Sequence, residues 1–155
     1  MPRLTAQGAA LTGLVLELFR VHGLVLAAGD TLAAPAGLTS ARWQILGVVD
    51  HGATTVAQVA RTMGLTRQSV RQTADALARD GLLKHVDNPA DRRARLIALT
   101  PAGRRALRQV EARHAGWADR LAADLDPAAV QATLAGLRDL ATRLELPSVT
   151  RKRKR

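Results

Sequence analysis

The sequence predicts a mainly α-helical fold that carries one small β-hairpin. Apolar residues recur at helical spacing through most of the 155-residue chain. The aromatic residues are only Phe19, Trp43 and Trp117, so the core must consist of Leu, Val and Ala, which favours close-packed helices. Two short apolar runs flank a polar loop near residue 90, which is the pattern of a hairpin.

Two helices are predicted before residue 51. The first covers residues 9–32, where apolar positions keep helical spacing. Pro35 and Gly37 mark a connection, and a second amphipathic helix then runs to about Asp50. Residues 51–53 are predicted to form a turn into the next element.

Residues 55–83 read as two short helices joined by a tight turn, and the rest of the chain is organised around them. Gly64 is expected to end the first helix because glycine adopts a left-handed backbone without steric cost. Thr66 is expected to cap the second helix, which should continue to about Asp80. The buried stripe of the first helix is predicted at Val56, Val59, Ala60 and Met63.

The second helix has an outer face of Arg and Gln that begins in its first turn, at Arg67, Gln68, Arg71 and Gln72, and Asp75 lies on the same face. Arg can make two hydrogen bonds to guanine and Gln can make two to adenine, so this face suits a DNA major groove. The alternative is a helical hairpin whose basic outer face is merely solvated.

The predicted hairpin has strands at 82–87 and 94–99 and a loop at 88–93. Its loop and the adjoining strand carry Asp91, Arg92, Arg93 and Arg95. Guanidinium groups at a hairpin tip can enter a minor groove or bind phosphates. A solvated charged loop is the alternative interpretation.

Two further helices are predicted at the C-terminal side, each starting at an N-cap followed by proline. The first runs from Thr100 and Pro101 to about residue 125, and the second from Asp126 and Pro127 to residue 147. With the first helix, they carry apolar stripes that need a partner, which favours a two-fold homodimer. The predicted division is 1–38 and 101–147 for dimerisation, 39–100 for DNA binding, and 148–155 as a basic tail.

Composition restricts the classes of function. The net charge is +10, and the last five residues, all Lys or Arg, supply half of it, so even the remainder of the chain should be drawn to polyanions. The absence of cysteine excludes disulfides and Cys-based zinc sites and is compatible with the cytoplasm. No signal peptide is visible, and because Glu17 and Arg20 interrupt the first apolar stretch, we expect no membrane-spanning segment.

Three stretches together resemble the MarR family of bacterial winged helix-turn-helix transcription regulators. They read LTSARWQILGVV, TVAQVARTMGLTRQSVRQTADALARDGLL and DNPADRRARLIALTPAG. The resemblance implies a homodimer that binds double-stranded DNA at a pseudo-palindromic operator and is released by a small-molecule effector. It implies no cofactor. The tail at 151–155 is not part of the pattern and is either a non-specific DNA tether or an inert polar tail.

The resemblance also assigns residues. The recognition helix is matched by Thr66, Arg67, Gln68, Ser69, Arg71 and Gln72, and the wing by Asp91, Arg92, Arg93 and Arg95. In the family pattern the wing Asp holds a nearby Arg side chain in the extended conformation that reaches the DNA. A departure lies at His85 and Val86, where members of the family often carry basic residues.

An effector pocket, if the family pattern holds, would lie between the dimerisation helices and the DNA-reading unit, near His22, Trp43 and Trp117. The alternative for Trp43 is ordinary core packing. The four histidines lack paired spacing, so no metal site is predicted, although one assembled from distant elements stays open.

The working hypothesis is a cytoplasmic, dimeric, sequence-specific repressor. An architectural protein that coats nucleic acid without sequence preference is the alternative, which the clustering of Arg and Gln on one helix disfavours. An enzyme is the third candidate. The sequence contains no nucleophile elbow, glycine-rich phosphate loop or His-Glu zinc motif, so we predict no catalytic residues.

Overall fold

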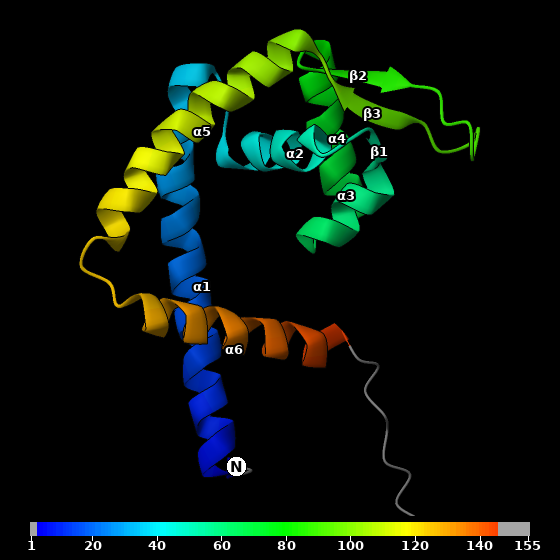
Figure 1. Cartoon of the computed structure of the whole chain (residues 1–155). Helices are drawn as coiled ribbons and strands as arrows, with labels where there is room; N and C mark the ends of the chain where they lie inside the picture. The colour runs from blue at the N-terminus through cyan, green and yellow to red at the C-terminus, as the bar shows by residue number, and fades with distance from the viewer. Residues whose placement is uncertain (1–2, 146–155) are drawn as a thin grey trace, which may run out of the picture. The chain divides into compact units, whose positions relative to one another are not determined.

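The computed structural model describes residues 3–145, and the chain divides into two units (Figure 1). The first unit extends to Ala115 and the second begins at Gly116. The elements of the first unit are α1 (Ala6–Ala33), the 3-10 helix η1 (Ala34–Ala36), α2 (Ser40–Asp50), β1 (Thr54–Thr55), α3 (Val56–Met63), α4 (Arg67–Arg79), β2 (Leu83–Val86), β3 (Leu96–Leu99) and most of α5 (Pro101–Ala122). The second unit contains the end of α5 and α6 (Pro127–Glu145).

The predicted mainly helical fold with a small hairpin is confirmed, and the helix ends have the predicted caps. Gly64 has φ 64°, the left-handed conformation expected after α3. The hydroxyl of Thr66 accepts the backbone N–H of Ser69 at 3.2 Å, which starts α4. The first helix is longer than predicted and begins at Ala6. The hydroxyl of Thr5 accepts the backbone N–H of Gly8 at 3.0 Å and caps it there.

The sheet contains three antiparallel strands in the order β1-β3-β2, whereas the sequence predicted only two. The missed strand pairs Thr54 with Ile97 and Thr55 with Leu96. Two residues are too few to show the alternation that identifies a strand. The predicted hairpin strands are also shorter than expected, because side-chain hydrogen bonds of the loop replace ladder pairing near its tip.

An aliphatic core holds the first unit together, as the sequence predicted. It lies among α2, α3, α4, α5 and the sheet, and its largest fully buried side chains include Ile45, Leu46, Leu77, Ile97 and Leu107. Ion pairs at its edge join distant elements. Arg42 of α2 binds Asp80 after α4 at 2.7 Å, while Arg104 and Arg108 of α5 bind Asp50 of α2 at 2.6 and 2.7 Å.

The α1 helix leaves many of its apolar side chains exposed. Phe19 is 70% exposed, and Leu11, Leu14, Leu16, Val21, Leu24 and Val25 are also exposed. By length and composition α1 with η1 could cross a membrane, since a window within residues 6–36 has a mean hydropathy of 1.6, so Glu17 and Arg20 do not make this stretch too polar to span a bilayer. The absence of a membrane-spanning segment stays a prediction. One such helix is weak evidence for a span, because core helices of soluble proteins pass the same test.

In the second unit α5 ends at Ala122, before the predicted position, and residues 123–126 form a turn. The Asp126 carboxylate accepts the N–H of Ala128 at 3.0 Å and thereby starts α6. The α6 helix has no buried residue, and Leu144 is 77% exposed. Its predicted end at residue 147 and the basic tail at 148–155 lie outside the described residues.

The start of α5 packs directly on the turn before β2, and this contact tests the fold. A Cβ at Gly103 would lie 2.0 Å from the carbonyl oxygen of Leu82, whereas a Cβ at Gly47 of α2 would meet nothing within 4 Å. We therefore expect Gly103→Ala to lower the free energy of unfolding by about 1 to 3 kcal/mol through overpacking. Gly47→Ala is the matched control and should raise it by about 0.5 to 1 kcal/mol. Urea denaturation measures both, and an unchanged midpoint for Gly103→Ala would contradict this packing.

Candidate nucleic-acid interface

The α4 helix presents its polar face to solvent because its apolar face is fixed in the core. Val70, Ala74 and Leu77 are each 0% exposed. Their burial sets the rotation of the helix about its axis. The predicted recognition residues on the opposite face are all exposed, namely Thr66, Arg67, Gln68, Ser69, Arg71 and Gln72.

The wing tip is held by two short polar side chains. The Asp91 carboxylate accepts the backbone N–H of Arg93 at 2.9 Å. The Asn88 side chain accepts the N–H of Ala90 at 3.0 Å and donates to the carbonyl of Ala94 at 2.9 Å. Such bonds let Asx residues close a turn locally. Asp91 thus holds the backbone of Arg93, whereas the family pattern implied that it holds an Arg side chain.

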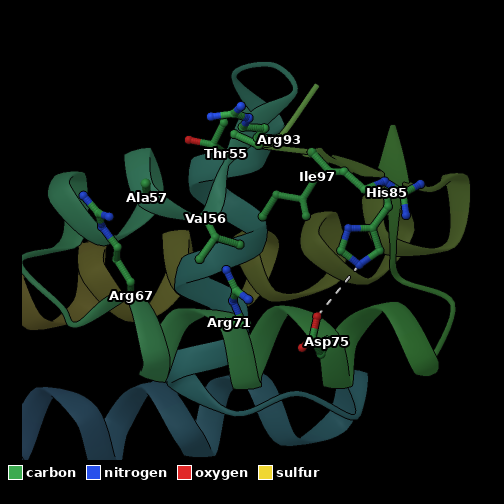
Figure 2. A pocket seen from close by; sticks show the side chains of 11 residues that line it. Thr55, Val56, Ala57, Arg67, Arg71, Asp75, His85, Arg93 and Ile97 are labelled. Carbon is green, nitrogen blue, oxygen red and sulfur yellow. Dashed lines mark ion pairs between the residues drawn. The ribbon is translucent and has the colours of Figure 1, made fainter. Parts of the chain in front are cut away.

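The recognition helix and the wing face one groove of about 430 Å³ (Figure 2). Arg67 and Arg71 line it from α4, and Arg93 and Arg95 line it from the wing. Figure 2 shows Arg67 and Arg71 rising from α4, with Arg93 across the groove beside Thr55. Two predicted groups that are distant in sequence therefore share one strongly positive surface. Arg92 is exposed on the wing but does not line the groove.

Sequence reasoning missed two parts of this surface. Thr55, Val56 and Ala57 line the groove because β1 adds to the sheet at that edge. The second part is the pairing of Asp75 with His85, in which His85 Nε2 lies 3.8 Å from Asp75 Oδ1 (Figure 2). The sequence placed Asp75 on this face of the helix, four residues after Arg71, but nothing local predicts its pairing with β2.

The three residues predicted near an effector pocket belong to two different units of the chain. Trp43 packs against the core, and its ring lies 5.1 Å from that of His114 at an interplanar angle of 61°. His22 is exposed on α1, and Trp117 belongs to the second unit. The pocket stays a prediction. Within residues 3–145 no group of three or more His, Asp or Glu residues could hold a metal ion.

A capped helix with an Arg and Gln face beside an Arg-tipped hairpin defines a winged helix-turn-helix DNA-binding protein. A family model described as the MarR family matches residues 36–94. The chain is also 42% identical over 132 residues to an uncharacterized protein of Mycobacterium tuberculosis, covering 85% of this chain and 92% of that protein. The protein belongs to the MarR family, and it is a DNA-binding transcriptional regulator.

Solved structures agree with this assignment. CouR from Rhodococcus jostii RHA1, bound to p-coumaroyl-CoA, is 30% identical with a TM-score of 0.74, covering 83% of this chain and 91% of CouR. A second structure shows CouR, described as a transcriptional repressor, bound to a 23-mer DNA duplex. It is 27% identical with a TM-score of 0.73, covering 91% of this chain and 99% of that chain. The M. tuberculosis regulator MOSR in complex with DNA is 26% identical with a TM-score of 0.71, covering 85% of this chain and 98% of MOSR.

The wing contacts predict how Asp91 acts on DNA binding. Asp91→Ala removes the acceptor for Arg93 N–H and should weaken DNA binding by about 0.5 to 1.5 kcal/mol, roughly 2- to 10-fold. Asp91→Asn keeps an acceptor oxygen and removes a negative charge, so it should bind DNA at least as well as the wild type. Fluorescence anisotropy on labelled DNA measures both. Equal losses in the two variants would instead favour a direct Asp91–Arg side-chain contact.

Proposed function

We propose that this protein is a cytoplasmic, dimeric, sequence-specific repressor whose release from DNA is triggered by a small-molecule effector. The observation that supports it is the convergence of Arg67 and Arg71 of α4 with Arg93 and Arg95 of the wing around one groove. In this proposal residues 66–80 read the major groove, and the wing at 88–95 binds the minor groove or phosphates.

Sequence specificity is proposed because the exposed first turns of α4 carry two kinds of base-reading side chain. Arg71 and Gln72 are adjacent and exposed, and their partners in a duplex are guanine and adenine respectively. A protein that only coats phosphates requires positive charge but no such pairing. The architectural alternative therefore accounts for the charge and leaves the Gln residues unexplained.

The proposed dimer rests on apolar surface that the described chain leaves uncovered. Leu16, Phe19 and Leu24 of α1 are each more than half exposed, and a row of apolar side chains on α6 is also exposed. Burying one aromatic side chain at an interface removes about 150 to 250 Å² of surface from water. A two-fold dimer would also present two recognition helices to the two halves of a pseudo-palindromic operator.

Repression and effector release are proposed from relatives. CouR is described both as a transcriptional repressor and as bound to p-coumaroyl-CoA. BadR of Rhodopseudomonas palustris, which is 27% identical over 95 residues, is described as a transcriptional activatory protein. Repression and activation are therefore distinguished by deleting the gene of this protein and measuring the change in reporter expression. Increased expression supports repression.

The base-reading role is tested on DNA upstream of the protein's own gene, with length-matched random DNA as the reference. Arg71→Ala or Gln72→Ala should weaken specific binding by about 1 to 3 kcal/mol and leave non-specific binding almost unchanged. Arg79→Ala, at the exposed end of the same helix, is the control and should change neither.

Fluorescence anisotropy at about 150 mM salt gives these affinities, and a specific regulator should prefer its site by about 1,000-fold or more. If Arg71→Ala lowers the affinity for both DNAs equally, Arg71 contacts only phosphate. Equal wild-type binding to a mapped operator and to random DNA would establish the architectural alternative.

The dimer is tested at Phe19. Phe19→Glu places a charge on the exposed apolar face of α1 and should shift the protein from dimer to monomer in analytical ultracentrifugation, because an unpaired buried charge is costly. Gln7→Glu adds the same charge at an exposed polar position of α1 and should leave the dimer intact. A wild-type monomer at micromolar concentration, or a Phe19→Glu dimer, would exclude α1 as the interface.

A further inference from the structure

A second concave surface lies at the base of the wing, where the sheet meets the start of α5. Its volume is about 720 Å³, which is within the size range of small-molecule sites, and it is open to solvent. We call it the wing-base groove and define it by Lys84, Leu99, Pro101, Arg104, Arg105 and Arg108. None of these residues lines the groove that faces the recognition helix.

The wing-base groove combines apolar and cationic groups. Leu99 and Pro101 supply apolar surface next to the first turn of α5. The hydroxyl of Thr100 is already engaged, since it accepts Gly103 N–H at 3.0 Å and donates to the carbonyl of Gly81 at 2.6 Å. The positive end of the α5 dipole adds to the field at this end of the groove.

The four cations of the wing-base groove differ in what neutralises them. Arg104 and Arg108 bind Asp50, and Arg108 also binds Glu111. Within residues 3–145 neither Lys84 nor Arg105 forms an ion pair or a side-chain hydrogen bond, and no carboxylate lines the groove. The groove therefore carries two uncompensated positive charges beside apolar surface.

We propose that the wing-base groove binds a small amphiphilic anion, in which an apolar ring or chain lies on Leu99 and Pro101 and a phosphate or carboxylate binds Lys84 and Arg105. Charge complementarity selects the anion, and the apolar surface selects against inorganic ions. This site goes beyond the proposed function, because DNA binding by α4 and the wing tip does not require it. It is also separate from the predicted pocket near His22, Trp43 and Trp117.

The test uses 1-naphthyl phosphate as the probe and the full chain as the protein. Isothermal titration calorimetry measures its affinity, and the amide NMR shifts of Lys84, Thr100 and Arg105 locate it. The double variant Lys84→Gln, Arg105→Gln should bind the probe about 10-fold more weakly, as expected for the loss of charge-assisted contacts. The control double variant Arg79→Gln, Arg120→Gln removes the same charge at exposed positions outside the groove and should bind it normally.

Several outcomes would overturn the proposal. One is the absence of saturable probe binding up to about 5 mM, because even a weak ligand site has a Kd of about 1 mM. Another is that the control variant loses as much probe affinity as Lys84→Gln, Arg105→Gln. Equally tight binding of inorganic phosphate or of 1-naphthol would show that the groove does not recognise both parts of the ligand.

DNA affinity measured on the same samples separates this proposal from the proposed function. Intact operator binding without probe binding rejects only the groove. If Lys84→Gln, Arg105→Gln instead lowers DNA affinity and the salt dependence of binding, the groove contacts flanking phosphates, and the small-ligand proposal is wrong.

Discussion

The burial of one face of α4 is the constraint on which the rest of the DNA-binding unit depends. Val70, Ala74 and Leu77 are completely buried against an aliphatic core, so α4 cannot rotate about its axis without exposing them. Successive residues of a helix are about 100° apart, so even a one-residue rotation would turn Arg71 away from the groove. The core thus determines which side chains can meet DNA, although none of its own residues does.

The wing is positioned by a second set of constraints that act through the backbone. β3 lies between β1 and β2, so the sheet links the segment before α3 to the hairpin. At the other end, Gly103 lets the start of α5 approach the carbonyl of Leu82. The hairpin is therefore fixed at its base by α5, while Asn88 and Asp91 order its tip.

The arginines serve two different purposes. Arg42, Arg104 and Arg108 bind carboxylates of other elements and link α2 to the end of α4 and to α5. Exposed ion pairs of this kind stabilise a fold only modestly, but they restrict where the helices lie relative to one another. Arg67 and Arg71 bind no carboxylate within residues 3–145, so their charge is available to a polyanion. On α5, Arg104 and Arg108 bind Asp50, whereas Arg105 forms no ion pair within residues 3–145.

Local sequence patterns determined the helices, their caps at Gly64 and Thr66, and the exposed Arg and Gln face, because helical period and cap chemistry involve residues only a few positions apart. Only the tertiary structure decided the contacts between elements that are distant in the sequence. β1 exists because Thr54 and Thr55 pair with Ile97 and Leu96 of a strand much later in the chain, Asp75 meets His85 across two elements, and Asp50 binds two arginines of α5. Such contacts depend on how the aliphatic core brings elements together, and no local period in the chain encodes them.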